Sequence, residues 1–506
     1  MKARIKHLLV MLALTACLGL MSAGRVTAQT FTTLHTFTAL VSETNSDGAQ
    51  PYAGLILSGN TLYGTTTFGG AIFGGTVFAI NTNGTGFTNL FSFNPVYTND
   101  DGAQPYAGLI LSGDTLYGTA EYGGTNGFGT VFALSTNGTS FNGLHNFMYL
   151  SATDGCYPLG GLVLSGSTLY GTTEAGGVDV WGNVFTVSTN GTNFTILHTF
   201  GDVDRKFIQG VSVLTNGDGY NPAAGLILSG NTLYGTAEVG GTNGAGTVFA
   251  LNTNGNSTAL HHFTAIISRS GLSGNLTNSD GANPVSGLIL SGNTLYGTAQ
   301  SGGTYGNGTV FSVSNNGTSF TLLHTFGSTN NPNSTNSDGA NPVSGLILSG
   351  NTLYGTAQHG GTNGNGTVFS VSTTGTNFTT LYTFTATSGS GLTNSDGANP
   401  CDSVILSGNT LYGTAQYGGT NGDGTVFSIS LGSVTVTPPQ LVITQFGTNV
   451  ILTWPTNATG FTLQFTTNLA PPAVWSTNSS APVIANTNNA VTNSISGTQK
   501  FYRLSQ

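Results

Sequence analysis

The chain has 506 residues, of which 38% are hydrophobic and 5% charged, and its formal net charge is −9. This composition supplies enough apolar side chains for a core, and the negative charge argues against nucleic acid and anionic membrane surfaces as partners. The 77 glycines recur at fixed places between short apolar runs. Glycines placed in this way mark turns between strands and exclude a low-complexity linker.

The first 28 residues show the pattern of a secretory signal peptide. Three basic residues precede an apolar stretch, Leu8–Met21, and small residues end at Ala28. We predict cleavage after Ala28, and therefore a protein that is secreted or associated with the cell envelope. Lipoprotein processing at Cys17 is the alternative, because Leu14–Cys17 resembles a lipobox.

Loss of residues 1–28 would leave five basic against 18 acidic residues, a formal charge of −13. No later segment approaches the ~20 apolar residues of a membrane-spanning helix, so we expect no transmembrane segment after signal removal. Cys156 and Cys401 would remain, at different positions in their repeats. We expect two thiols there, and no disulfide scaffold.

One phrase, Leu-Ile-Leu-Ser-Gly-Asn-Thr-Leu-Tyr-Gly-Thr at Leu55–Thr65, returns six more times with small changes. Successive copies lie 53 to 64 residues apart, and their Tyr-Gly pairs begin at Tyr63, Tyr117, Tyr170, Tyr234, Tyr296, Tyr354 and Tyr412. This period is typical of one four-stranded unit of a repeat fold, such as a propeller blade. In the first copy the predicted strands are Gly54–Ser58, Thr61–Thr67, Gly75–Asn81 and Phe87–Phe93.

The two ends of the repeat region complement each other. Phe31–Phe37 matches the fourth strand of the other copies, whereas the seventh copy stops after its third strand, Thr425–Ser430. We therefore predict an all-β fold in which residues 29–431 form a seven-bladed β-propeller closed by an N-terminal outer strand. A solenoid is the alternative, but it would have no use for this complementarity.

The character of the chain changes after the seventh copy. A linker at 432–439 introduces several short predicted strands over 440–506, among them Asn449–Trp454. This pattern predicts a small β-sandwich with Trp454 in its core. Because the segment has no cysteine, it is expected to be fibronectin type III-like.

The repeat resembles a known family. Leu-Tyr-Gly-Thr followed by Gly-Gly and Gly-Thr-Val-Phe, with Asp-Gly-Ala-Asn-Pro upstream, is similar to the GloVer-type tandem repeat of exported bacterial proteins over Phe31 to Leu431. That family carries varied C-terminal anchoring segments (the choice-of-anchor type) and implies no defined activity. The chain departs from it in having no apolar anchor tail, which leaves surface anchoring open.

An aspartate precedes glycine in every copy, at Asp47, Asp101, Asp154, Asp218, Asp280, Asp338 and Asp396. A carboxylate among Asn and Ser carbonyl groups could bind calcium, but one carboxylate per loop supplies few of the six to eight oxygen ligands that this ion takes. We expect an Asx-type turn instead, and hence no metal site and no cofactor.

Two other positions recur. The position after the second strand holds Thr67, Glu121, Glu174, Glu238, Gln300, Gln358 and Gln416. We expect a hydrogen-bonded rim there, because an amide cannot act as a general acid.

The outermost strand holds His145, His198, His261 and His324 where other copies have Phe91 and Tyr382. Replacement by aromatic residues favours packing over metal binding.

The residues that break the repeat are the best candidates for binding. The third copy carries Asp179 and Trp181 in the loop after its second strand, and a long insert, Gly201–Asn216, follows it. The predicted ligand-binding residues are Asp179, Trp181, Asp202, Asp204, Arg205, Lys206 and Arg269. Both loop classes open on one propeller face, where binding residues usually lie, and Trp and Arg are favoured contact residues. A tolerated surface insertion is the alternative.

No zinc-protease, phosphate-loop or serine-hydrolase motif is present in the sequence, so we predict no catalytic residues. We expect an exported, non-catalytic repeat protein that binds extracellular glycan or protein through one propeller face. The alternatives are a carbohydrate-active propeller enzyme that uses face carboxylates, and a purely structural envelope protein.

Overall fold

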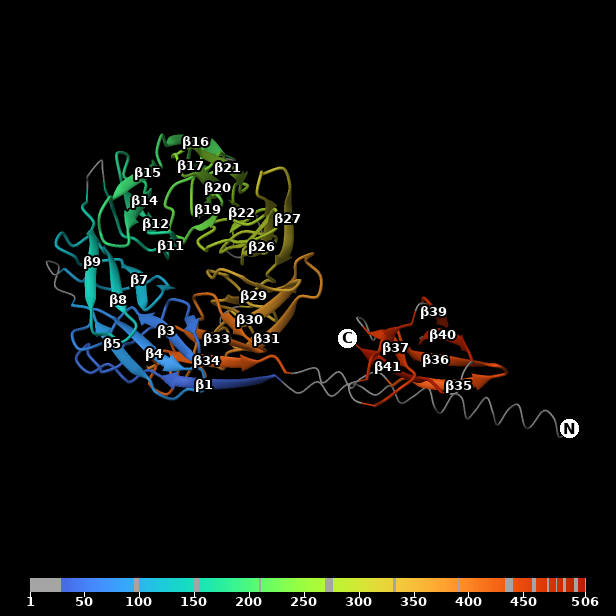
Figure 1. Ribbon diagram of the computed structural model, residues 1–506. Coiled ribbons are helices and arrows are strands. Elements are labelled where there is room, and N and C mark those ends of the chain that lie inside the picture. The colour runs from blue at the N-terminus through green and yellow to red at the C-terminus, as the bar shows by residue number, and fades with distance from the viewer. Residues whose placement is uncertain are drawn as a thin grey trace. The chain divides into compact units, whose positions relative to one another are not determined.

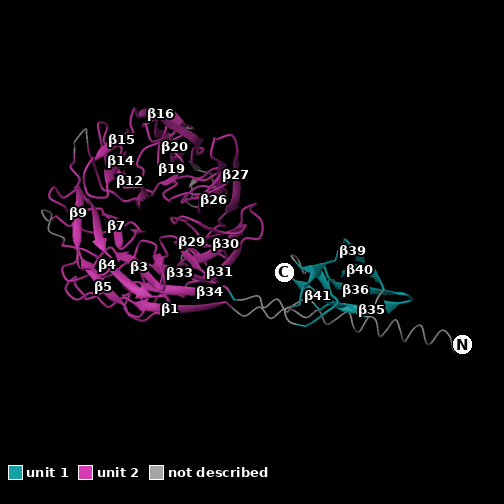
Figure 2. Cartoon of the chain, viewed as in Figure 1, with its two compact units in different colours: residues 1–28, 432–506 teal, residues 29–431 magenta. Residues whose placement is uncertain are grey.

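The computed structural model describes residues 29–94, 100–149, 154–208, 211–268, 276–330, 334–389, 391–432, 440–456, 461–470, 473–478, 480–485, 488–495 and 499–505. The predicted signal peptide with Cys17, most of the predicted linker, and Arg269 lie outside these ranges. The chain divides into two compact units, Gln29–Leu431 and a unit that contains Gly432–Gln506 (Figure 2). No helix long and apolar enough to cross a membrane occurs in the described parts.

The described part of Gln29–Leu431 holds seven four-stranded antiparallel sheets, one for each copy of the repeat, and we number them in chain order. Sheet 1 is β2 (Ile56–Ser58), β3 (Thr61–Thr66), β4 (Thr76–Asn81) and β5 (Thr88–Ser92); sheet 2 is β6 (Ile110–Ser112), β7 (Thr115–Ala120), β8 (Thr130–Ser135) and β9 (Phe141–Asn146); sheet 3 is β11 (Val163–Ser165), β12 (Thr168–Thr173), β14 (Asn183–Ser188) and β15 (Thr195–Thr199). Sheet 4 is β18 (Ile227–Ser229), β19 (Thr232–Ala237), β20 (Thr247–Asn252) and β21 (Ser257–His262); sheet 5 is β24 (Ile289–Ser291), β25 (Thr294–Ala299), β26 (Thr309–Ser314) and β27 (Phe320–Thr325); sheet 6 is β28 (Ile347–Ser349), β29 (Thr352–Ala357), β30 (Thr367–Ser372) and β31 (Thr379–Thr383). Sheet 7 is β32 (Ile405–Ser407), β33 (Thr410–Ala415), β34 (Thr425–Ser430) and β1 (Thr30–Thr36). Because the described residues contain strands and no helix, the predicted all-β class is confirmed.

The described part of Gln29–Leu431 also contains three two-stranded sheets. They are β10 (Gly155–Cys156) with β13 (Ala175–Gly176), β16 (Asp204–Ile208) with β17 (Val211–Thr215), and β22 (Ile267–Ser268) with β23 (Leu276–Thr277). The β16–β17 pair lies within the long insert Gly201–Asn216, for which no strand was predicted: Asp204 pairs with Thr215 and Ile208 with Val211 in a regular antiparallel register.

The glycine of each Tyr-Gly pair makes room for an aromatic ring. Gly64 in β3 pairs with Phe78 in β4. A Cβ atom on Gly64 would lie 2.6 Å from Phe78 Cζ and 2.8 Å from Leu55 Cδ2. Phe78 is fully buried, so the ring takes the space that a side chain would need. The same crowding recurs at Gly118, Gly171, Gly235, Gly297, Gly355 and Gly413.

β1 completes sheet 7. Thr30 pairs with Ser430 and Thr36 with Thr425, with a register shift between Thr33 and His35. The predicted fit between the N-terminal strand and the last copy is confirmed. The strand leaves β34 with a neighbour on each side, as in the other six sheets.

Successive sheets contact one another through an inner row of small residues that precede the first strand of each sheet. A Cβ atom on Gly108 would lie 3.6 Å from the Gly54 carbonyl oxygen, and one on Gly225 would lie 3.1 Å from that of Gly161. The row returns to its start, because a Cβ atom on Gly54 would lie 3.0 Å from the Ser403 carbonyl oxygen. Figure 1 shows the sheets following one another around a common centre.

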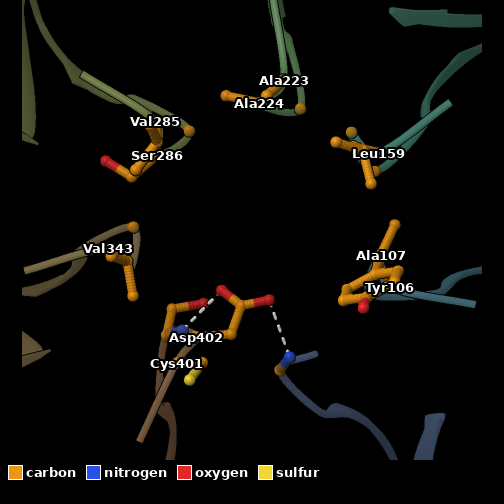
Figure 3. A pocket seen from close by; sticks show the side chains of 18 of the residues that line it. Tyr106, Ala107, Leu159, Ala223, Ala224, Val285, Ser286, Val343, Cys401 and Asp402 are labelled. Carbon is orange, nitrogen blue, oxygen red and sulfur yellow. Dashed lines mark hydrogen bonds between the residues drawn. The ribbon is translucent and has the colours of Figure 1, made fainter. Parts of the chain in front are cut away.

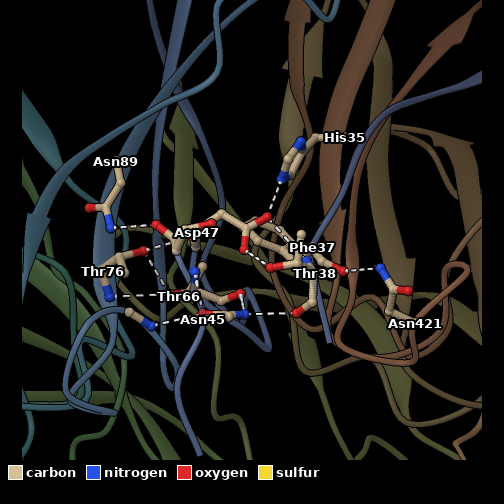
Figure 4. Close-up of polar contacts among 12 residues, drawn as sticks. His35, Phe37, Thr38, Asn45, Asp47, Thr66, Thr76, Asn89 and Asn421 are labelled. Carbon is tan, nitrogen blue, oxygen red and sulfur yellow. Dashed lines mark hydrogen bonds and ion pairs between the residues drawn. The ribbon is translucent and has the colours of Figure 1, made fainter. Parts of the chain in front are cut away.

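The recurring histidine combines packing with hydrogen bonding (Figure 4). The His35 ring stacks on Phe87 with centroids 3.9 Å apart, and its Nε2 lies 2.9 Å from Asp47 Oδ2. The predicted packing role is confirmed, but the pairing with the aspartate was not predicted. The equivalent pairs are His145 with Asp154, His198 with Asp218, His261 with Asp280, and His324 with Asp338.

The turn predicted for the aspartate is made largely by an asparagine. Asn45 Oδ1 accepts hydrogen bonds from the backbone N–H groups of Gly48 and Gly70, both at 2.9 Å, and its Nδ2 donates to two carbonyl groups. An amide can do both, whereas a carboxylate only accepts. Asp47 instead accepts from His35 and Thr38; although burial alone would raise its pKa, these bonds lower the pKa of Asp47 below the ordinary value.

The unit that contains Gly432–Gln506 has two sheets in its described part. One is β35 (Val442–Phe446), β36 (Asn449–Pro455), β40 (Asn488–Ser494) and β39 (Val483–Ala485); the other is β38 (Ser476–Thr477), β37 (Thr462–Thr466) and β41 (Phe501–Ser505). Trp454 is buried with Leu452, Leu463 and Val491. The prediction that Trp454 lies in the core of this segment is confirmed.

Candidate functional site

Two connections beside sheet 3 form a surface pocket. Asp179, Trp181, Asp202, Val203 and Asp204 line a cavity of about 450 Å³. The segments are held together by close packing, since a Cβ atom on Gly201 would lie 2.2 Å from Asp179 Oδ2. The structure therefore brings together four of the seven predicted binding residues.

Arg205 and Lys206 lie next to this pocket on β16 but do not line it. Arg205 Nη1 donates a 3.0 Å hydrogen bond to Ser212 Oγ on the neighbouring strand β17. Phe207 follows them and is 74% exposed. The hairpin thus presents two cations and an exposed aromatic ring beside three carboxylates; we call the pocket and this hairpin the loop patch.

Trp181 has a packing role in addition to lining the pocket. Its ring lies 4.8 Å from that of Tyr220 between centroids. It is half-buried and packs against the core cluster of sheets 3 and 4. Its backbone carbonyl accepts a 3.0 Å hydrogen bond from Asn221 N. A free binding surface is therefore offered more by the exposed hairpin than by this tryptophan.

A larger cavity, not predicted from the sequence, lies at the centre of the ring of sheets (Figure 3). Its volume is about 600 Å³, and residues just before or within the first strands of the sheets form most of its wall. Tyr52, Tyr106, Glu121, Cys401 and Asp402 are among the residues that line it. The Tyr52 and Tyr106 rings meet at 72° with centroids 5.2 Å apart.

The glutamates of the recurring position are more buried than a rim position implies. Burial, with a smaller contribution from the nearby Glu174 carboxylate, raises the pKa of Glu121 to about 7 against the opposing effect of a hydrogen bond from Tyr122. Burial also raises the pKa values of Glu174 and Glu238. In sheets 6 and 7 the matching amides are hydrogen-bonded through Cys401: Gln358 Nε2 donates to its sulfur at 3.3 Å, and the thiol donates to Gln416 Oε1 at 3.3 Å.

Cys156 and Cys401, the two cysteines of Gln29–Leu431, are free thiols as predicted, and both are buried. Burial raises the pKa of each to about 12, which keeps them protonated at neutral pH. No group of three or more His, Cys, Asp and Glu side chains in the described ranges is placed to hold a metal ion.

The family model described as the Gloeobacter/Verrucomicrobia repeat matches residues 18–217, 205–336 and 268–449. These overlapping matches span all seven sheets. The chain belongs to the Gloeobacter/Verrucomicrobia repeat family. The resemblance to the GloVer repeat is therefore confirmed.

Comparison with curated proteins gives no match. Among solved structures, a Mycobacterium tuberculosis puromycin-hydrolyzing peptidase is 11% identical with a TM-score of 0.44, over 83% of this chain and 61% of the peptidase, so the chain spans less than two thirds of its length. An oligogalacturonate lyase in complex with manganese is 10% identical (TM-score 0.42, 81% and 98% covered), and YCF48 from Cyanidioschyzon merolae is 9% identical (TM-score 0.41, 79% and 98% covered). Similarities this weak support no inference about this chain.

Because the Gloeobacter/Verrucomicrobia repeat occurs seven times, each position can be compared across the sheets. The residue after the proline that enters the first strand is, in chain order, Tyr52, Tyr106, Leu159, Ala223, Val285, Val343 and Cys401. The next residue is Ala53, Ala107, Gly160, Ala224, Ser286, Ser344 and Asp402. The central cavity is therefore asymmetric even though the scaffold repeats.

Proposed function

We propose that this Gloeobacter/Verrucomicrobia repeat protein is exported and non-catalytic, and that it binds extracellular glycan or protein through one face of a closed seven-bladed propeller. Closure is supported by the β1–β34 pairing and by the inner row of small residues that returns from Ser403 to Gly54. The expected signal peptide and the family resemblance support export. The second unit would act as a fibronectin type III-like spacer or sorting module.

The observation that carries the binding role is the loop patch. Residues that break the repeat in two separate connections meet at one pocket, and the adjoining hairpin exposes Phe207, Arg205 and Lys206. An exposed aromatic ring beside cations is typical of a recognition surface. Both connections leave the ends of strands that point the same way, so they share one face.

A glycan array and polysaccharide pull-down with the purified protein tests this role. The variant Arg205→Ala, Lys206→Ala, Phe207→Ala changes only exposed side chains, and Val41→Ala, at an exposed residue in another connection, is the matched control. We expect binding that the triple variant loses and the control keeps. Binding that survives the triple variant would remove the loop patch from the proposal.

A carbohydrate-active enzyme is the second candidate, and one observation favours it. The raised pKa of Glu121, about 7, suits a general acid at neutral pH. Hydrolysis of an oligosaccharide by the wild-type protein, abolished in Glu121→Gln, would support this candidate over the non-catalytic one. A purely structural envelope role would show neither ligand nor hydrolysis.

A further inference from the structure

The wall of the central cavity has two unlike sides. Its phenols come from the neighbouring sheets 1 and 2, as Tyr52 and Tyr106. The equivalent residues of sheets 3 to 6 are aliphatic: Leu159, Ala223, Val285 and Val343. Figure 3 shows Ala223 and Val285 across the cavity from Asp402, with Val343 next to Asp402 and Leu159 next to Tyr106. A ligand that fits both sides must have an apolar body and one polar end.

The polar side carries two carboxyl groups. Asp402 occupies a position where the other six sheets have Ala, Gly or Ser. The position of Glu121 also holds a glutamate in sheets 3 and 4, but of these three glutamates only Glu121 lines the cavity. Asp402 Oδ2 accepts a 2.7 Å hydrogen bond from Gly54 N, and its Oδ1 accepts one of 2.6 Å from Ser403 N. These bonds fix the carboxyl group at the junction of sheets 7 and 1. Glu121, which is only 8% exposed, supplies a second carboxyl group from sheet 2.

The described lining of the cavity holds no basic side chain that could balance these groups. Among the described residues that line the cavity, none is Lys, Arg or His. Burial raises the pKa of Asp402 and of Glu121, which reflects the cost of holding a carboxylate away from water without a cation. A positive charge that entered the cavity would be attracted to both carboxyl groups and to the tyrosine ring faces.

We propose that the central cavity binds a small organic cation, an ammonium compound with an apolar body, whose charged group lies near Asp402, Glu121 and the Tyr52–Tyr106 corner. The apolar body would contact the aliphatic side. The volume of about 600 Å³ lies within the usual range for small-molecule sites. This inference goes beyond the proposed function, because the site and the ligand class both differ from those of the loop patch.

The test is titration calorimetry of the purified protein with choline chloride and with its uncharged isostere, 3,3-dimethylbutan-1-ol. The two probes share shape and apolar surface and differ in charge. We expect choline to bind at one site per chain and the isostere to bind at least tenfold more weakly. Equal binding of the two probes, or no heat from millimolar choline, would overturn the proposal. Binding of glucose without choline would also overturn it, in favour of a neutral sugar site.

The variants copy residues that other sheets already hold at the same positions, so each should fold. Asp402→Ala matches Ala53, Tyr106→Val matches Val285, and Glu121→Gln matches Gln300. We expect Asp402→Ala and Tyr106→Val each to weaken choline binding about tenfold, while Glu238→Gln, at the position of Glu121 in sheet 4 but not lining the cavity, leaves it unchanged. Choline binding that survives Asp402→Ala combined with Glu121→Gln would exclude the site. The loop patch variant keeps the cavity intact, so failure of either proposal leaves the other standing.

Discussion

The Tyr382 hydroxyl donates a 2.7 Å hydrogen bond to Asp396 Oδ2. Five other outer strands have a histidine at the position of Tyr382, and each histidine contacts the aspartate that is equivalent to Asp396. One strand departs from this pattern: Phe91 occupies the position of the histidine in the copy whose aspartate is Asp101. A phenylalanine keeps the ring packing, 4.2 Å from Phe141 between centroids, but it has no group to donate. Burial raises the pKa of Asp101, whereas Asp47, which has its histidine, has a lowered pKa.

Phe91→His should therefore stabilise the protein. The new ring can stack as the other histidines do and donate to Asp101, which adds about 1 kcal/mol to the free energy of unfolding at pH 7. Tyr382→Phe should cost about 1 to 2 kcal/mol, because it removes the donor to a buried carboxylate. Chemical denaturation of both variants checks the pair; a loss of stability in Phe91→His would contradict the donor argument.

The Asp47 pair predicts acid sensitivity. Because the folded-state pKa of Asp47 is lowered, its contribution is complete above the unfolded-state pKa near 3.8 and disappears as the pH falls through the lower folded value. His35→Phe should reduce stability at pH 6 by about 1 to 3 kcal/mol and have a smaller effect at pH 3. Denaturation curves at the two pH values measure the difference, and an equal loss at both would indicate that packing alone was changed.

Glu121 predicts the opposite pH dependence. Its folded-state pKa is raised to about 7 from 4.5, so the native state holds the proton more tightly and stability falls as the pH rises from about 4.5 to above 7. The full span corresponds to about 3 kcal/mol. Glu121→Gln should flatten the stability profile between pH 5 and pH 8, with wild type measured in the same buffers; a profile that keeps its slope would assign the dependence to other groups, such as Glu174 or Glu238.

Gly64→Ala should destabilise sheet 1 by about 1 to 3 kcal/mol, because its Cβ atom would collide with Phe78 in a packed core. Gly217→Ala is the matched control, since a Cβ atom there meets nothing within 4 Å. The midpoint of thermal unfolding should drop for the first variant and stay within experimental error for the second. A similar drop for both variants would contradict the steric explanation, because the entropy effect of replacing glycine by alanine is stabilising.

The strands could be predicted because glycine and asparagine residues mark the turns at their ends. The predicted strand Thr61–Thr67 is β3, Thr61–Thr66, and Gly75–Asn81 is β4, Thr76–Asn81. The hairpin β16–β17 was missed, because the charged run at Asp204–Lys206 hides the apolar alternation of Val211 and Val213. That alternation, after a glycine, was the available signal.

The loop patch could be predicted in part, and the central cavity could not. Asp179 and Asp202 lie in connections that leave sheet 3 after its second and fourth strands, which run in the same direction. The predicted strand order was therefore enough to expect both residues at the same end of the sheet. The cavity depends on which residue of each entering segment faces the centre. In the sequence Tyr52 and Asp402 are only single substitutions at two neighbouring variable positions of the repeat. That both residues line one cavity becomes visible only in the assembled sheets.

The pairing of Thr30 with Ser430 has a consequence for how the protein is made. The two residues are 400 positions apart, and at typical synthesis rates of about 5 to 20 residues per second the first strand waits roughly 20 to 80 s for its partner. During that time β1 has no partner strand, and the sheets already synthesised lack the seventh sheet that β1 completes. Any factor that accompanies the emerging chain therefore has a defined segment to protect, Thr30–Thr36, and a defined moment of release, the arrival of β34.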